Sequence, residues 1–526
     1  MVTENDPFHH KALLSERARR WGGVGIIVGI SIVVHYHLGV CLVSRYYCRE
    51  ANRLFHDGCY GLAARCLEKA AEWDPAYGPI FTRQGEAYLK TASFVSDPAM
   101  ASQLAGQSRQ SYQKAVGLNP LSVESIYGLA KAESVLETLR SDSTAYAPES
   151  LFRKAVQLRP NSIQYRYALI KYLASRNKTD KLLPMVADMA RIYPDCVAVL
   201  KKEPFWSPEM KTQLRMGLAQ SIQQGICIES AHRALSSLAA GESDWQTALN
   251  EFRQALENKV SGAGRDDYMR LGHLFLKARQ IEDAGNAFIR SLHDSHCMDT
   301  DLERIYQAYR GEKASEALIQ LFQIHSPQLR VFPMTNLLIA RSYMDLKEYR
   351  QARLVLDEMN RNAPRAEAFY QLARIDQFEK QWDAMELHSQ KATVLDPTTS
   401  RYHLLFSQAL IRQGKLQRAE SEAGLALKAA SRPSAGLYHH RARIRWKSQN
   451  FSDAAADWKS AIELSPRNAG YYARAGEAYA RMGHIEQAIG YLSEATGLAS
   501  DPTYYRKRYR ELKCLTSPGP SSTSRL

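Results

Sequence analysis

Residues 435–466 read AGLYHHRARIRWKSQNFSDAAADWKSAIELSP, and residues 469–502 repeat the arrangement as AGYYARAGEAYARMGHIEQAIGYLSEATGLASDP. The repeat distance is about 34 residues, which is the length of a helix–turn–helix unit. Small residues stand at matching positions of the two copies: Ala442, Ala461, Gly476 and Ala495. Two helices approach closely only where side chains are small, so these positions predict the contact between the paired helices of each copy.

Large aromatic residues accompany the small ones in both copies. We expect them to fill the space beside each helix crossing: Tyr438, Trp458, Tyr472 and Tyr479. Each copy closes on a proline, Pro466 or Pro502, which ends its second helix. One helical pair cannot bury its apolar face alone, so neighbouring pairs are expected to stack. The pattern therefore predicts an all-α solenoid.

These two copies resemble the tetratricopeptide repeat (TPR) family. The resemblance implies a right-handed superhelix of helix–turn–helix units, with a concave ligand surface lined by the first helix of every unit. Weaker copies, closed by Pro75, Pro120, Pro160, Pro194 and further prolines, extend the resemblance over most of residues 44 to 510. Repeats of this kind specify an architecture, whereas fold alone does not specify an activity.

The chain divides into six segments by pattern. The predicted segments are 1–21, a short polar tail; 22–43, a transmembrane helix; 44–195, an N-terminal TPR-like array; 196–264, degenerate repeats or a joint; 265–512, a C-terminal TPR-like array; and 513–526, a disordered tail. At 526 residues a single compact core would normally split, but a solenoid avoids this limit because each unit packs only on its neighbours.

The stretch Gly22–Val43, GGVGIIVGISIVVHYHLGVCLV, contains no Asp, Glu, Lys or Arg. Its length matches a bilayer core at the rise of an α-helix, so we expect one transmembrane helix before the first repeat. His35 and His37 oppose this interpretation slightly, because polar groups at depth are costly. The excess of Lys and Arg before the span favours a single-pass protein of a bacterial inner membrane, with a cytoplasmic N-terminus and extracytoplasmic repeats. Gly25 and Gly29 form a G-x-x-x-G motif through which two copies would pack as a homodimer.

The net charge of +14 leaves the class of partner open. The basic residues are spread along the chain, so we expect a solvated surface of mixed charge and not a nucleic-acid-binding protein. The eight cysteines form no C-x-x-C pair. Cys41, Cys48, Cys59 and Cys66 lie near the start of the chain, and we expect them to be buried free thiols. A disulfide between Cys48 and either Cys59 or Cys66 is the alternative if this segment lies in an oxidising compartment.

The sequence carries no motif of a catalytic or cofactor site. It lacks HExxH, G-x-S-x-G and a Walker A sequence. His293, His296, Cys297 and Asp299 lie close together, but one short cluster supplies no fixed coordination geometry. We therefore expect a protein that is not an enzyme and that binds neither metal nor cofactor.

The ligand groove is projected from the family resemblance. Alternate turns of each first helix would face the groove, which places Arg341, Arg374 and Arg443 at one equivalent position in three units. The neighbouring turns of these helices add Tyr370, His439 and Trp446. A basic and partly aromatic stripe of this kind suits an acidic peptide. The alternative is that these arginines pair with Glu367, Asp376 and neighbouring acids.

Three functions follow as hypotheses. The first is a non-catalytic, membrane-anchored scaffold that recruits a protein partner, by analogy in envelope assembly, secretion or polysaccharide export. The second is an accessory subunit that positions substrate for a glycan-transferring or polymerising membrane enzyme. The third is a cytoplasm-facing adaptor that binds anionic lipid or nucleic acid, for which steep salt dependence would be the signature.

Overall fold

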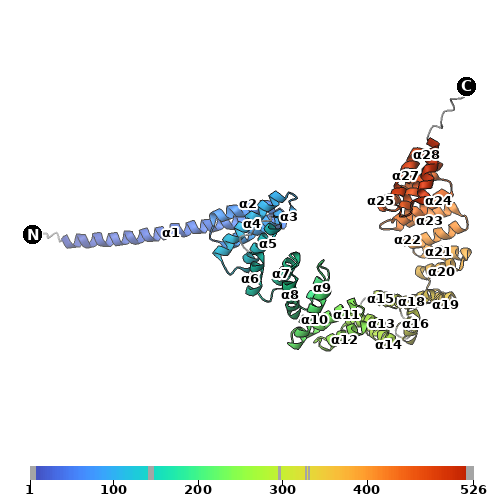
Figure 1. Cartoon of the computed structure of the whole chain (residues 1–526), viewed down its shortest axis with the longest axis horizontal. Helices are drawn as coiled ribbons and strands as arrows, with labels where there is room; N and C mark the ends of the chain where they lie inside the picture. Colours follow the sequence, from blue (N-terminus) through green and yellow to red (C-terminus); the bar gives the residue numbers. More distant parts are fainter. Residues whose placement is uncertain (1–6, 140–146, 294–297, 326–328, 330–331, 517–526) are drawn as a thin grey trace, which may run out of the picture. The chain divides into compact units, whose positions relative to one another are not determined.

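The computed structural model describes residues 7–139, 147–293, 298–325, 329 and 332–516, of which 7–30, 32 and 514–516 are described as helical backbone only. All regular secondary structure in these residues is α-helix (Figure 1). The chain divides into two compact units, residues 1–262 and 263–526.

Unit 1 is built of helices joined by short turns. They are α1 (Pro7–His56), α2 (Tyr60–Trp73), α3 (Gly78–Phe94), α4 (Pro98–Leu118), α5 (Val123–Leu139), α6 (Pro148–Leu158), α7 (Ile163–Ser175), α8 (Thr179–Ile192), α9 (Cys196–Leu200), α10 (Pro208–Gln223), α11 (Ile228–Gly241) and α12 (Trp245–Glu257). The helices α1/α2, α3/α4, α5/α6, α7/α8 and α11/α12 pack as antiparallel hairpins, and α10 packs between α8 and α11.

Unit 2 continues the same construction. Its helices are α13 (Arg265–Lys277), α14 (Ile281–His293), α15 (Met298–Gly311), α16 (Ser315–Ile324), α18 (Pro333–Asp345), α19 (Tyr349–Asn362), α20 (Ala366–Glu379), α21 (Trp382–Leu395), α22 (Ser400–Arg412), α23 (Leu416–Ala429), α24 (Ala435–Lys447), α25 (Phe451–Leu464), α26 (Ala469–Arg481), α27 (Ile485–Leu498) and α28 (Thr503–Thr516). Successive helices pair from α13/α14 to α26/α27, and α28 packs against α27.

The small residues lie where the sequence places them, at the contacts between paired helices. Ala442, Ala461 and Ala495 are fully buried, as is the large ring of Trp458, which packs in one cluster with Ala442. A Cβ added to Gly476 of α26 would come within 3.0 Å of Leu492 Cγ in α27. The expected all-α architecture of stacked helical hairpins is therefore present.

The turns inside the hairpins use a left-handed residue. Gly414 (φ 75°) joins α22 to α23, and Gly483 (φ 81°) joins α26 to α27. Gln449 and Lys380 occupy the equivalent turns of two other hairpins at φ 60°. A left-handed residue after a helix lets backbone N–H groups reach the last carbonyls, which ends the first helix and reverses the chain.

The prediction of a transmembrane helix at residues 22–43, and with it a single-pass membrane location, is wrong. Over the part of the chain that the structure describes, no helix has both the length and the apolar character needed to span a membrane. Residues 22–43 lie inside the 50-residue helix α1, where the exposed His35, Tyr36 and His37 interrupt the apolar run. From Ser44 onward α1 packs on α2 as the first helix of a hairpin, with Ser44 Oγ donating a hydrogen bond to the carbonyl of Ala70 (3.2 Å).

Other predictions near the chain ends fall outside the described residues. The side chains of residues 7–30 are not described, so the proposed dimer contact through Gly25 and Gly29 lies outside the description, as do residues 1–6 and 517–526 of the two predicted tails. The six cysteines that the structure describes, Cys41, Cys48, Cys59, Cys66, Cys196 and Cys227, are free thiols.

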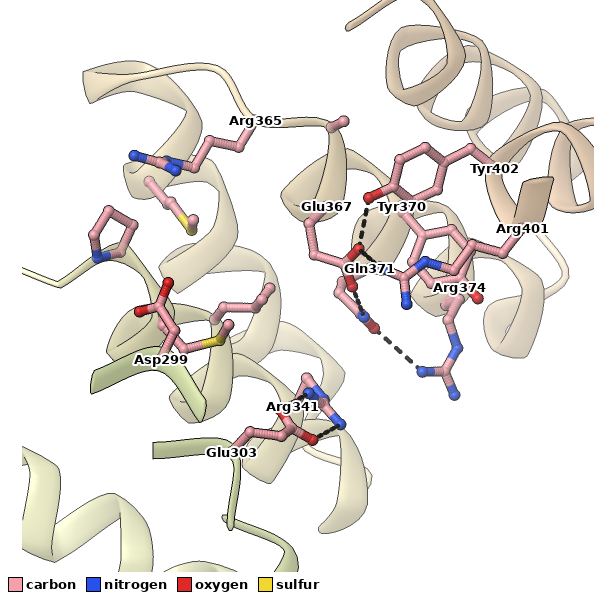
Figure 2. A pocket seen from close by; sticks show the side chains of 15 residues that line it. Asp299, Glu303, Arg341, Arg365, Glu367, Tyr370, Gln371, Arg374, Arg401 and Tyr402 are labelled. Atoms are coloured by element: carbon pink, nitrogen blue, oxygen red, sulfur yellow. Dashed lines mark hydrogen bonds and ion pairs between the residues drawn. The ribbon is translucent and has the colours of Figure 1, made fainter. Parts of the chain in front are cut away.

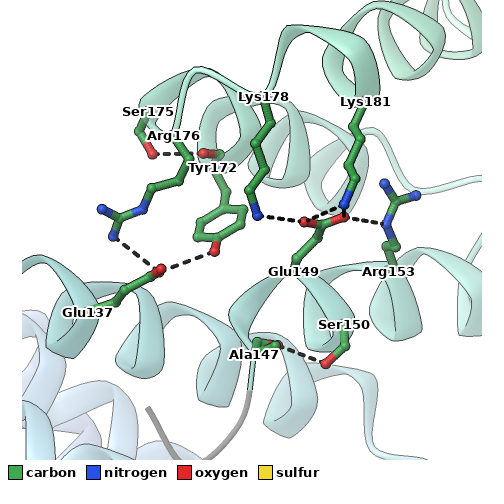
Figure 3. Close-up of polar contacts among 10 residues, drawn as sticks. All are labelled: Glu137, Ala147, Glu149, Ser150, Arg153, Tyr172, Ser175, Arg176, Lys178 and Lys181. Carbon is green, nitrogen blue, oxygen red and sulfur yellow. Dashed lines mark hydrogen bonds and ion pairs between the residues drawn. The ribbon is translucent and has the colours of Figure 1, made fainter. Parts of the chain in front are cut away.

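A cluster around Glu149 joins α6 to the start of α8 (Figure 3). The Glu149 carboxylate pairs with Lys178 Nζ (2.8 Å), Lys181 Nζ (3.1 Å) and Arg153 Nε (3.1 Å). The hydrogen bond from Lys178, together with those from Lys181 and Arg153, outweighs the effect of burial and lowers the pKa of Glu149 to about 2. The charged carboxylate therefore ties two hairpins of unit 1 together.

We expect Glu149→Gln to lower the free energy of unfolding by about 1–2 kcal/mol at neutral pH, because it removes charge-assisted hydrogen bonds from a largely buried group. The folded pKa lies below the ordinary value of 4.5, so the contribution is fully present above pH 4.5 and is lost as the pH falls towards 2. Urea unfolding of both proteins at a series of pH values measures this. Glu72→Gln, at an exposed position of the same unit, is the control, and parallel pH profiles for wild type and Glu149→Gln would contradict the assignment.

We also expect Gly217→Ala to destabilise the chain by about 1–3 kcal/mol through overpacking. A Cβ at Gly217 of α10 would lie 2.1 Å from the backbone oxygen of Ala187 in α8, where no side chain can move aside. Gly106→Ala is the matched control, because that position inside α4 has open space around it and alanine favours a helix. Thermal unfolding followed by circular dichroism should separate the two, with Gly106→Ala equal to or more stable than wild type.

Candidate functional site

A cavity of about 750 Å³ opens on the first helices of four consecutive hairpins of unit 2, namely α15, α18, α20 and α22 (Figure 2). We name it the α15–α22 cavity. Its lining residues are Asp299, Glu303, Pro333, Met334, Leu337, Arg341, Met359, Arg365, Ala366, Glu367, Tyr370, Gln371, Arg374, Arg401 and Tyr402. Charged groups and apolar side chains therefore share one surface.

One side of the cavity is closed by an ion pair between α15 and α18. Arg341 donates to both carboxylate oxygens of Glu303, at 2.7 and 3.1 Å, and its guanidinium stacks 4.3 Å from the ring centre of Tyr306. Burial would raise the pKa of Glu303, but the hydrogen bonds from Arg341 and Gln307 hold it below its ordinary value. Both groups are therefore charged and satisfy each other at neutral pH.

The opposite side is a chain of hydrogen bonds centred on Glu367 of α20. Arg401 Nη2 (2.5 Å) and the Tyr402 hydroxyl (2.7 Å), both from α22, donate to Glu367 Oε2. Gln371 Nε2 donates to Glu367 Oε1 (2.8 Å), and Arg374 Nη1 donates to Gln371 Oε1 (3.2 Å), as Figure 2 shows. Burial and the bond to Glu367 raise the pKa of Tyr402 to about 12, so its hydroxyl remains a donor.

Two arginines of the cavity, Arg365 and Arg374, are not neutralised by a carboxylate of the described residues. Arg374 donates a hydrogen bond to the amide of Gln371 and lies over the Phe378 ring at 5.9 Å from its centre, and Arg365 is exposed. Figure 2 shows these two guanidiniums on different sides of the cavity. Four arginines face three acidic residues, so the surface retains one excess positive charge.

The wall between the charged groups is apolar. Pro333, Met334 and Leu337 of α18 and Met359 of α19 line it. Tyr370 packs against Tyr402 with ring centres 5.2 Å apart, and Arg401 lies over the Tyr370 ring at 5.3 Å. A ligand for this surface combines apolar side chains with negative charge, because both kinds of contact are offered side by side.

The structure brings together three of the six predicted groove residues. Arg341, Tyr370 and Arg374 line the α15–α22 cavity, whereas His439 and Trp446 line two other cavities and the exposed Arg443 lines none of those described. His439 Nδ1 accepts a hydrogen bond from Trp458 Nε1 (3.0 Å), and Trp446 packs on Trp458 with ring centres 5.8 Å apart, so both serve partly as internal contacts.

The main residues that the sequence prediction missed are Glu303, Arg365, Arg401 and Tyr402. A signal for one of them was present, because Asp299, Pro333, Glu367 and Arg401 are spaced 34 residues apart and all four line the cavity. The same position of successive first helices thus faces the ligand surface, two helical turns before the projected position of Arg341 and Arg374. The alternative, in which these arginines pair with neighbouring acids, is found for Arg341, which pairs with Glu303. The two acids named in that alternative have other partners, because Glu367 pairs with Arg401, and Asp376 with Arg353 and His388.

No group of three metal-ligating side chains occurs among the residues that the structure describes. Of the close-set group noted in the sequence, His296 and Cys297 lie outside the described residues. The residues that line the α15–α22 cavity offer charge pairing, hydrogen bonding and apolar contact.

A family model described as "Tetratricopeptide repeat" matches residues 469–502. No curated protein matches the chain. Among solved structures, the chain is similar to yeast Tom70, at 13% identity over 90% of this chain and 96% of that chain, with a TM-score of 0.34. It is similar to the APC/C hetero-tetramer Cut9–Hcn1 at 13% identity over 89% of this chain and 96% of that chain, with a TM-score of 0.33. It is also similar to YrrB, a TPR protein with an unusual peptide-binding site, at 15% identity over 38% of this chain and 100% of that chain, with a TM-score of 0.33. The family model thus identifies residues 469–502 as one tetratricopeptide repeat.

We expect Glu367 and Tyr402 to be energetically coupled, because the Glu367 carboxylate accepts a hydrogen bond from the hydroxyl of the buried Tyr402. A double-mutant cycle of Glu367→Gln and Tyr402→Phe, measured by urea unfolding, should give a coupling energy of about 1 kcal/mol. The control cycle pairs Glu367→Gln with Tyr370→Phe, since the Tyr370 ring contacts its neighbours by stacking. Equal coupling in the two cycles would show that the hydroxyl of Tyr402 does not support Glu367.

Proposed function

Because this chain is a tetratricopeptide repeat protein, we propose that it is a scaffold that binds an extended, acidic peptide segment of a protein partner in the α15–α22 cavity. Solenoids offer extended concave surfaces to partners. The observation that carries the proposal is the unequal pairing of the four arginines: Glu303 and Glu367 neutralise two of them, while Arg365 and Arg374 are without a carboxylate among the described residues.

The unpaired arginines favour carboxylate ligands. A guanidinium offers paired N–H donors that match the two oxygens of a carboxylate, and such charge-assisted bonds are stronger than neutral ones. Arg374 is held by Gln371, so its position is fixed before the ligand arrives. Less side-chain entropy is lost on binding when the donor is already ordered.

The apolar wall favours an extended backbone. Successive side chains of an extended peptide point in opposite directions, so acidic and apolar residues in alternation reach different walls. Acidic side chains would reach Arg365 and Arg374, while apolar side chains would pack on Met334, Leu337 and Met359. The envelope, secretion and polysaccharide-export roles depended on the membrane anchor and form no part of this proposal.

We expect the double charge reversal Arg365→Glu and Arg374→Glu to weaken binding of a fluorescein-labelled peptide of alternating Asp and Leu at least about tenfold, because two charge-assisted contacts become repulsive. Fluorescence anisotropy with the full-length chain measures the affinity. Binding should also weaken as salt is added, since ion pairs with the ligand are screened.

Arg443→Glu is the matched control, because Arg443 is an exposed arginine of the same unit that does not line the cavity. It should leave the affinity unchanged, and a peptide with Asn in place of Asp should bind weakly to every variant. Unchanged affinity in the double reversal, with the fold intact by circular dichroism, would refute the proposed site.

A further inference from the structure

A second basic cavity lies between the last hairpin and the final helix of unit 2. It has a volume of about 400 Å³ and is lined by Trp446 of α24, by Arg474, Glu477 and Arg481 of α26, and by Tyr504, Lys507, Arg508 and Glu511 of α28. We name it the α26–α28 cavity. The α28 residues follow the spacing i, i+3, i+4 and i+7, so one face of that helix forms a whole wall.

The helix that forms this wall is fixed by its own core. Leu512 is buried, and Tyr505 and Tyr509 pack with it against Ala488, Leu492 and Ala495. The Tyr504 hydroxyl also donates to Glu477 Oε1 of α26 at 2.9 Å. The charged side chains of α28 are therefore presented from a packed helix towards those of α26.

The charges in this cavity are not balanced. Four cationic residues face two acidic ones, so two positive charges are in excess. Both acids already have partners: Glu477 pairs with Arg474 of its own helix at 2.9 Å and also accepts the hydrogen bond from Tyr504, and Glu511 pairs with Arg508 of its own helix at 2.7 Å. Arg481 of α26 and Lys507 of α28 have no acidic partner among the described residues. The excess thus comes from two opposed helices.

The charge of the cavity selects among anions. A carboxylate brings one negative charge, whereas a phosphate monoester brings between about 1.5 and 2 at neutral pH together with three acceptor oxygens. Arg474 and Arg508 are themselves partly exposed and pair with acids at i+3 of the same helix, an arrangement that stabilises a helix only weakly, so these pairs can be exchanged at small cost. Cations on both walls could then contact one phosphate.

We propose that the α26–α28 cavity binds a phosphate monoester carried on a side chain of a peptide. Trp446, half-buried, and Tyr504, largely exposed, stand at the same cavity and offer aromatic surface to the group that carries the phosphate. This site is separate from the α15–α22 cavity and shares no residue with it. Its ligand chemistry is therefore independent of the acidic-peptide proposal.

The test uses the full-length chain and three fluorescein-labelled glycine–serine peptides that carry a central phosphotyrosine, sulfotyrosine or tyrosine. We expect the phosphotyrosine peptide to bind at least about tenfold more tightly than the tyrosine peptide, because the unmodified side chain lacks the charge. The sulfotyrosine peptide has a similar shape but one negative charge, so it should bind with intermediate affinity. Inorganic phosphate should compete with the phosphotyrosine peptide.

The decisive variant is Arg481→Ala with Lys507→Ala, which should abolish the preference for the phosphorylated peptide. Arg506→Ala with Arg510→Ala is the matched control. This variant removes the same amount of positive charge from exposed positions of α28 that do not line the cavity. All four side chains are exposed, so neither variant should lose its fold. Equal loss of affinity in both variants, no phosphate preference in the wild type, or tighter binding of a single-stranded oligonucleotide that both variants weaken alike would overturn the proposal.

Discussion

Paired helices in this chain approach each other where one backbone carries little or no side chain, and the rest of each hairpin is arranged around that contact. At Gly217 the backbone of α10 lies so close to Ala187 of α8 that a methyl group would overlap the carbonyl oxygen. Tyr112 of α4 shows the complementary arrangement, because its buried ring occupies the space that Gly85 of α3 and Gly128 of α5 leave open. Close contacts of this kind leave little freedom in how a helix is rotated.

Fixed rotation explains why one position recurs on the ligand surface. The residues Asp299, Pro333, Glu367 and Arg401 occupy equivalent places on four successive first helices and line one cavity. Equivalent positions on adjacent helices are neighbours in space, so an acid in one repeat meets a base in the next, as Glu367 meets Arg401. The repeat period thus determines where charges meet, while the residue in each repeat determines which of them remain unpaired.

Much of the architecture could be predicted from sequence because the small residues and prolines recur at a fixed distance. The stretch at 22–43 misled the prediction because it was judged by its lack of charged residues, whereas His35, Tyr36 and His37 interrupt its apolar run. Arg341, Tyr370 and Arg374 were predicted to share a surface from their place in the repeat, and they line one cavity. Arg401 and Tyr402 were missed because their partner Glu367 lies on a different helix.

The two cavities differ in how their acids are used, and this difference follows from where the acids stand. In the α15–α22 cavity the pairs Glu303–Arg341 and Glu367–Arg401 cross from one helix to the next, so each pair neutralises a wall and joins two repeats. In the α26–α28 cavity the pairs Arg474–Glu477 and Arg508–Glu511 stay within one helix. The α26–α28 cavity keeps the larger excess of positive charge because its four cationic residues face two acids, whereas four arginines face three acids in the α15–α22 cavity.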